Sequence, residues 1–292
     1  MIFFFAYFAT LRENFFLFLI DTIFKMKTRI FSGIAFGVIM IASIWYSEWS
    51  YLIIFGLLTG LGIYEFYSLL ANQDIHPSKV TGIIIGLAWY ALVFLYVKNS
   101  ETSSYLILLL LLLPLLAIPE LYRKQHGSFR NFLGLTGGII YLAGGFSALH
   151  FIAYASGNYS YETILGFIFL QWSADTFAYF SGALFGKHKL FERISPKKTW
   201  EGSVGGAVMT ILISFILSKY ILFYSTMDWI IISILVVIFG AYGDLCESML
   251  KRNLNIKDSG TLIPGHGGIL DRFDGLLFSA PAVAAYLLLV GA

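Results

Sequence analysis

Long apolar stretches alternate with short polar ones along most of the chain. Apolar runs of about membrane-spanning length recur at residues 30–46, 50–71, 80–97, 104–120, 132–154, 161–184, 203–223, 227–249 and 273–291. A helix needs about 20 mostly apolar residues to cross a bilayer, and its backbone must satisfy its own hydrogen bonds in lipid. The pattern therefore predicts an all-α, polytopic integral membrane protein with about nine transmembrane helices.

The first part of the chain, residues 1–29, does not follow this pattern. It is apolar but interrupted by charged residues such as Arg12, Glu13 and Asp21, and it lacks the small-residue cleavage site of a signal peptide. Two interpretations stay open. It is either a helix lying at the membrane interface or an extension upstream of a working protein that starts near Met26.

The remainder divides into two parts by the distribution of its polar residues. Residues 30–155 are apolar with short loops, which indicates a transmembrane scaffold, whereas residues 156–292 hold both long polar loops and several intramembrane acids. We interpret the second part as the transmembrane catalytic region. The single cysteine, Cys246, excludes an intrachain disulfide and argues against a cysteine-based zinc site.

Lysine and arginine predict the orientation. When the sides of the membrane are alternated from Lys25 onward, 16 basic residues fall on one side and only Lys98 and Lys219 on the other. Basic residues accumulate on the cytoplasmic side. We therefore expect the polar loops 186–202 and 251–272 to face the cytoplasm, and the C-terminus to lie on the far side.

Four acids lie in or at the ends of apolar runs: Glu65, Asp175, Asp244 and Glu247. Charges in such places usually line a polar cavity or a pathway. For Glu65 a simple ion pair near the helix end explains the charge equally well, and for Asp175 a cavity is the better explanation. Asp244, Glu247, Ser248 and Lys251 are spaced so that they share one face of a helix.

The loop after this helix combines cations, acids and glycines. Asp271 and Asp274 return just before the last apolar run, where they can converge with Asp244. Carboxylate oxygens suit Mg²⁺, which binds proteins through one or two carboxylates together with substrate phosphates. The loop also contains cations that can neutralise phosphate oxygens, a histidine that we assign to phosphate binding or positioning, and glycines that free backbone N–H groups for an anion: Lys251, Arg252, Lys257, Arg272, His266, Gly265, Gly267 and Gly268. Together these residues suggest a metal-assisted reaction on a polyphosphate.

The other polar loop has a similar character. Ser195 and Pro196 are typical of the N-cap and first turn of a short helix. A helix N-terminus beside Lys197 and Lys198 would form an anion site. The alternative is an ordinary basic loop that only orients the protein.

A 27-residue stretch, residues 248–274, resembles the signature of the CDP-diacylglycerol synthases, also called phosphatidate cytidylyltransferases. The resemblance is carried by Ser, two residues, Lys-Arg, four residues, Lys-Asp, a glycine-containing turn, Pro, one residue, His-Gly-Gly, and Asp-Arg-Phe-Asp. The Asp175 segment with Tyr179 and Gly182, and the segment 195–202, are also similar to the family. The resemblance covers about residues 26–292, and residues 1–25 depart from it.

The resemblance implies that CTP and phosphatidic acid react to give CDP-diacylglycerol and pyrophosphate in phospholipid biosynthesis. It implies Mg²⁺ held by Asp244 and Asp271, with Asp274 as a third candidate ligand and a monovalent cation such as K⁺ as a candidate second ion. It also implies the lipid bilayer as a partner, no nucleic acid, and a bacterial inner (cytoplasmic) membrane location with the active site facing the cytoplasm. The oligomeric state stays open, with a homodimer as one alternative.

Two sets of residues are therefore predicted to carry the reaction. The catalytic set is Asp244, Lys251, Arg252, Lys257, Asp258, His266, Asp271 and Arg272. The substrate-binding set is Asp175, Ser195, Lys197, Lys198, Thr199, Ser248, Gly267 and Gly268.

Other classes of membrane protein explain less of the pattern. A transporter or channel also uses intramembrane acids but does not need the long basic loop. A CTP-dependent polyprenol kinase would share the nucleotide and the membrane but would act on an alcohol. A CDP-alcohol phosphotransferase would show an Asp-Gly…Ala-Arg…Gly…Asp…Asp pattern, which this sequence lacks.

Overall fold

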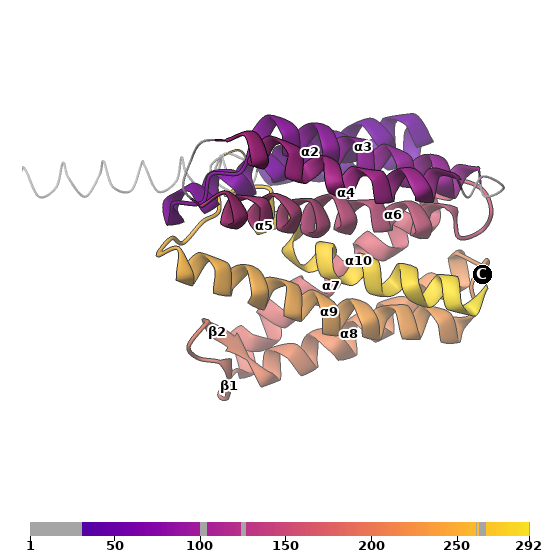
Figure 1. Ribbon diagram of the computed structural model, residues 1–292. Helices are drawn as coiled ribbons and strands as arrows, with labels where there is room; N and C mark the ends of the chain where they lie inside the picture. Colours follow the sequence, from indigo (N-terminus) through magenta and orange to yellow (C-terminus); the bar gives the residue numbers. More distant parts are fainter. Residues whose placement is uncertain (1–30, 100–103, 124–126, 261, 263–266, 292) are drawn as a thin grey trace, which may run out of the picture.

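The computed structural model describes residues 31–99, 104–123, 127–260, 262 and 267–291. The predicted N-terminal segment 1–29 and the predicted phosphate-binding residue His266 lie outside the described residues. Helices dominate the described part of the chain, as the hydropathy pattern predicts (Figure 1).

A helix at Phe31–Tyr46 comes first among the described residues. The following helical elements are α2 (Glu48–Leu70), η1 (Ala71–Gln73), α3 (Lys79–Lys98), α4 (Ser104–Tyr122), α5 (Ser128–Gly138), η2 (Ile139–Gly144), α6 (Gly145–Tyr154), α7 (Tyr161–Phe185), α8 (Trp200–Tyr220), α9 (Thr226–Asn253) and α10 (Leu270–Val290). A short antiparallel hairpin, β1 (Lys189–Phe191) and β2 (Ser195–Thr199), precedes α8.

Six helical segments of the described residues are long and apolar enough to cross a membrane. They are Glu48–Gln73, Lys79–Lys98, Ser128–Tyr154, Trp200–Tyr220, Thr226–Asn253 and Leu270–Val290. The segments Phe31–Tyr46 and Ile107–Tyr122 are apolar helices of shorter length, and α7 is not among the six. The all-α membrane class is thus supported, whereas the number nine for the spans stays a prediction.

The helices form two groups that pack on each other. Helices α2 to α6 lie together, α7 to α10 lie together, and α10 packs against both α9 and α6 (Figure 1). Close approach of α9 and α10 depends on Gly243, because a Cβ there would overlap the backbone carbonyl of Asp274. This contact sets Asp244, the next residue of α9, beside the first turns of α10.

Local capping explains where α9 begins. Ser225 and Asp228 form a reciprocal capping box: the Ser225 hydroxyl accepts from the Asp228 N–H at 3.2 Å, and the Asp228 carboxylate accepts from the Ser225 N–H at 2.9 Å. The helix then continues to Asn253. At the start of α9, the hydroxyl of Tyr286, near the C-terminal end of α10, donates to Asp228 at 2.6 Å, which ties α10 to α9.

The helix predicted to begin at Ser195 is wrong. Residues Ser195–Thr199 form strand β2, with Lys189 paired to Thr199 and Phe191 to Ser195. A residue that precedes proline disfavours the α conformation, so Ser195 is extended. The helix begins instead at Trp200, because the Thr199 hydroxyl accepts from the Gly202 N–H at 3.1 Å as an N-cap.

The two long polar loops lie at the same end of the molecule (Figure 1). Arg252, at the C-terminal end of α9, donates from Nε to the carbonyl of Ile194 between the two strands, at 3.4 Å. The hairpin therefore contacts the helix that leads into the second loop, as their predicted common orientation requires.

Candidate active site

A cavity of about 780 Å³ opens among the helix Phe31–Tyr46, the helices α7 to α10 and strand β2. Its wall includes apolar side chains such as Phe36, Met40 and Trp172. It also contains eight of the residues predicted from the sequence, all charged except Thr199: Asp175, Lys197, Lys198, Thr199, Asp244, Asp271, Arg272 and Asp274. Segments separated by about 100 residues thus contribute to a single site.

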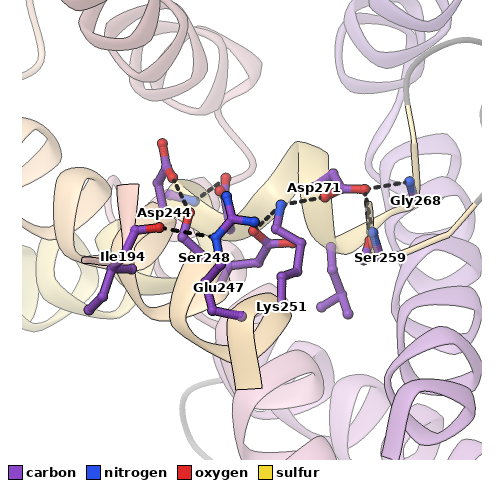
Figure 2. Close-up of polar contacts among 12 residues, drawn as sticks. Ile194, Asp244, Glu247, Ser248, Lys251, Ser259, Gly268 and Asp271 are labelled. Carbon is purple, nitrogen blue, oxygen red and sulfur yellow. Dashed lines mark hydrogen bonds and ion pairs between the residues drawn. The ribbon is translucent and has the colours of Figure 1, made fainter. Parts of the chain in front are cut away.

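The polar face of α9 forms as its spacing predicts. The Ser248 hydroxyl donates to Asp244 Oδ1 at 3.2 Å, and Lys251 Nζ lies 2.5 Å from Glu247 Oε2 (Figure 2). Both pairs are four residues apart, the separation at which helix side chains meet. The Glu247 side chain is only 1% exposed, so Lys251 neutralises a carboxylate that water does not reach.

Asp244 makes its cation contact across elements. Its Oδ2 atom lies 2.6 Å from Lys198 Nζ, and Lys198 belongs to strand β2. Both side chains are partly exposed and line the cavity. The hairpin therefore places the Lys198 cation in contact with Asp244, the carboxylate that is predicted from the sequence as a metal ligand.

Asp271 is held from several directions at the start of α10. Its Oδ1 atom accepts from Lys251 Nζ at 2.7 Å, while Oδ2 accepts from the backbone N–H groups of Ser259 and Gly268, both at 2.9 Å (Figure 2). The Ser259 hydroxyl lies 2.9 Å from the same Oδ2. The first turn of α10 is a favourable place for this negative charge.

Asp274 and Asp175 complete an acidic group beside the cavity. Both line the cavity together with Asp244. Asp274 Oδ1 accepts from the Gly275 N–H at 2.7 Å. Several carboxylates gathered beside Lys198 and Arg272 form a site of mixed charge, suited to a ligand that carries both phosphates and a cation.

Other predicted residues lie near this site without lining the cavity. Lys251 and Arg252 are in the last turn of α9, and Ser248 lies one turn earlier. Lys257 and Asp258 are exposed in the following loop. Ser195, Gly267 and Gly268 are likewise absent from the cavity wall.

Sequence reasoning missed three polar residues that the structure brings to the site. Gln171 of α7 is buried, accepts from the Ser279 hydroxyl at 2.9 Å and lies 3.4 Å from Asp175 Oδ2. The feature of the sequence that could have indicated Gln171 is its position one helical turn before the intramembrane acid Asp175. Ser259 contacts Asp271 from the loop, and Glu65, flagged as an intramembrane acid, was not assigned to the site.

A metal ion bound entirely by protein side chains does not fit the described residues. No group of three or more His, Cys, Asp or Glu side chains among them could hold one. In this arrangement Asp271 is engaged by Lys251, so a set made of Asp244, Asp271 and Asp274 stays a prediction. A Mg²⁺ ion that keeps waters and shares its ligands with substrate phosphates needs only one or two carboxylates, and the acidic group beside the cavity fits that requirement.

Comparisons with known proteins match most of the chain. Residues 27–290 match the model of the cytidylyltransferase family. The phosphatidate cytidylyltransferase of Staphylococcus haemolyticus is 35% identical over 195 residues, covering 66% of this chain and 72% of the relative. That of Staphylococcus saprophyticus is 43% identical over 139 residues, 44% of this chain and 53% of the relative. That of Haemophilus influenzae is 31% identical over 278 residues, 87% of this chain and 88% of the relative. A match of this extent shows that the chain belongs to the cytidylyltransferase family.

Proposed function

We propose that this chain transfers the cytidylyl group of CTP to phosphatidate, giving CDP-diacylglycerol and pyrophosphate. The observation that carries the proposal is a cavity lined by both charged and apolar side chains. A reaction between a water-soluble nucleotide and a lipid headgroup needs such a site. The relatives named above carry phosphatidate in their names, and the one from Haemophilus influenzae matches 87% of this chain.

The apolar wall suits the lipid. Phe36 and Met40 of the first described helix and Trp172 of α7 line the cavity, and they offer apolar surface to acyl chains. Burial of apolar surface contributes roughly 25 cal/mol for each Å² removed from water, although a chain leaving the bilayer gains less. The apolar part therefore serves to place the phosphate of the lipid at the charged part rather than to extract the lipid.

The charged wall suits phosphates. Lys197 and Lys198 of β2 and Arg272 of α10 line it together. Charge-assisted hydrogen bonds to phosphate oxygens are among the stronger ones in proteins. We assign these three cations to the phosphates of CTP and phosphatidate. Lys251, which lies between Glu247 and Asp271, is assigned to holding those carboxylates.

The chemistry then follows from positioning. A phosphate oxygen of phosphatidate attacks the α-phosphorus of CTP, a new P–O bond forms, and the bond between the α-phosphorus and its bridging oxygen breaks. Pyrophosphate leaves with the bonding electron pair. The attacking phosphate is already ionised, so no strong general base is needed, and the protein acts by alignment and charge neutralisation.

Asp244 and Asp271 are the residues proposed to hold Mg²⁺, with Asp274 nearby and K⁺ as a candidate second ion. A bound Mg²⁺ would polarise the attacked phosphoryl group and neutralise the leaving oxygens. In the structure, Lys198 Nζ lies 2.6 Å from Asp244 and Lys251 Nζ lies 2.7 Å from Asp271. When Mg²⁺ and its bound phosphates arrive, each carboxylate would exchange its lysine for the metal ion. Its negative charge would therefore be neutralised both before and after binding.

The proposed placement in the membrane follows the distribution of basic residues. Nine spans, with the polar loops 186–202 and 251–272 on the cytoplasmic side of a bacterial inner membrane, would expose the cavity to cytoplasmic CTP. The common position of the hairpin and the α9–α10 loop at one end supports this proposal.

The test uses CTP labelled at the α- or the γ-phosphorus. Purified protein is incubated with phosphatidate vesicles, Mg²⁺ and one labelled nucleotide, and the organic extract is counted. Label from the α-position should enter lipid and label from the γ-position should leave as pyrophosphate. A kinase would give the opposite result, and a lack of any phosphatidate-dependent α-label in lipid would overturn the proposal.

A further inference from the structure

Glu65 is a buried carboxylate near the C-terminal end of α2, far in sequence from the proposed active site. Its residue is 4% exposed. It accepts from the Ser259 hydroxyl at 2.5 Å and from the backbone N–H groups of Ile269 at 2.8 Å and Leu270 at 3.1 Å. These partners all belong to the loop between α9 and α10 or to the start of α10.

The contacts replace a cap that α10 lacks. Its N-cap residue is Ile269, whose side chain makes no capping hydrogen bond. The first N–H groups of a helix need acceptors, and negative charge at this end is favoured by the helix dipole. Glu65 supplies both from a different helix, more than 200 residues away in the chain.

The loop backbone is also shaped around this carboxylate. A Cβ at Gly268 would overlap the Glu65 side chain, and one at Gly260 would lie 2.8 Å from Glu65 Oε2. Both glycines therefore allow the backbone to approach the carboxylate more closely than another residue could. Both Gly260 and Gly268 therefore lie directly against the Glu65 carboxylate.

Ser259 connects Glu65 to Asp271. The serine hydroxyl lies 2.5 Å from Glu65 Oε1 and 2.9 Å from Asp271 Oδ2, and the serine N–H also binds that Oδ2 atom. A hydroxyl has one proton, so at any instant it donates to only one of the two carboxylates. Gly268, packed on Glu65, donates its N–H to the same Asp271 oxygen.

From these contacts we propose that Glu65 is a positioning residue: it holds residues 259–260 and 268–270 so that the Asp271 carboxylate is fixed at the cavity. The inference rests on the proposed function only in that Asp271 is there assigned to Mg²⁺ binding. Glu65 does not itself line the cavity, so it acts through Ser259 and the backbone. A misplacement of about 1 Å in a catalytic group costs on the order of 100-fold in rate.

The test compares Glu65→Leu, Glu65→Gln and Ser259→Ala with Thr59→Val. Thr59 is a matched control because it is also buried in α2, and its hydroxyl bonds only the carbonyl of Phe55, at 2.7 Å, among the contacts the structure gives it. Leucine leaves the donors of the loop without an acceptor. Glutamine keeps an acceptor for the Ile269 N–H, and its NH₂ group, in the place of Oε1, can donate to the Ser259 oxygen, which frees the serine proton for Asp271. The Leu270 N–H alone loses its acceptor.

Four results are expected from steady-state kinetics in detergent micelles. Glu65→Leu lowers kcat by about 10- to 100-fold with KM for phosphatidate changed less than about threefold, because the apolar wall is untouched. Glu65→Gln recovers most of the loss, and Thr59→Val keeps the wild-type kcat. The double variant of Glu65→Leu and Ser259→Ala is no slower than the slower single variant, since both act through one chain of contacts.

Amide hydrogen exchange gives a readout that does not depend on activity. The N–H groups of residues 259 and 268–270 should exchange at least about tenfold faster in Glu65→Leu and not in Thr59→Val. Unchanged exchange, a kcat within about twofold of wild type, or a Gln variant as impaired as the Leu variant would overturn the proposal. If wild-type protein makes no CDP-diacylglycerol, the proposed function fails, while exchange still decides whether Glu65 holds the loop.

Discussion

Removal of Lys251 should destabilise the protein far more than removal of an exposed lysine in an ion pair of the same length. Lys251 Nζ lies 2.5 Å from Glu247 and 2.7 Å from Asp271, and the three side chains are 17%, 1% and 8% exposed. Loss of one partner from a buried pair leaves an uncompensated charge and costs about 3–5 kcal/mol. We therefore expect Lys251→Met, which retains the apolar stem, to lower the free energy of unfolding by about that amount.

Lys98 provides the control. Its Nζ lies 2.5 Å from Glu48 Oε1, the same distance as in the Lys251–Glu247 pair, but the side chains are 30% and 24% exposed. Surface pairs contribute about 0–1 kcal/mol because water already solvates both charges. Lys98→Met should therefore cost about 1 kcal/mol or less, because its pair is more exposed and has one carboxylate in place of two.

Unfolding in mixed micelles with increasing SDS, followed by circular dichroism, measures both variants. A double variant with Lys251→Met and Glu247→Gln should be more stable than the sum of the single effects predicts, by about 0.5–3 kcal/mol, because the second change removes the stranded charge. If Lys251→Met stays within about 1 kcal/mol of wild type, or if the double variant is simply additive, the ion pair does not stabilise this site as argued.

Three further outcomes are expected. Asp244→Ala should remove most transfer activity at ordinary Mg²⁺ while the protein stays inserted, and near-normal turnover would exclude Asp244 as a metal ligand. Lys198→Gln, which alters the cavity wall, should lower kcat/KM by about 10- to 100-fold, whereas Lys219→Gln, at the exposed C-terminal end of α8, should change it less than about threefold; equal losses in the two variants would contradict the assignment of phosphates to the cavity wall. With Cys246 replaced, a cysteine at Arg193 should resist labelling from outside intact cells and one at the C-terminal end of α10 should react, and labelling at Arg193 would contradict the predicted orientation.

Features that depend on neighbouring residues could be predicted from the sequence. Apolar length predicted the helices, because a backbone in lipid must satisfy its own hydrogen bonds. Spacing along one helix predicted the shared face of Asp244, Glu247, Ser248 and Lys251, and both predicted i, i+4 contacts form. The dense motif 248–274 indicated the family, which the comparisons confirm.

Contacts between distant segments were decided only by the tertiary structure. The sequence marked Lys251 as a phosphate-binding cation, but packing of α10 beside α9 places it between two carboxylates. The helix predicted at Ser195 became a strand, since pairing with β1 and the cap at Thr199 together outweigh a local N-cap pattern.

Glu65 shows most clearly why such contacts cannot be predicted from the sequence. Its charge within an apolar run was visible, but its partners are backbone N–H groups, which every residue carries and no sequence pattern distinguishes. Their identity depends on α2 meeting the start of α10 across about 200 residues, an approach that two glycines of the loop permit. The sequence determined which groups needed burial and neutralisation, and the packing of helices determined which groups satisfied them.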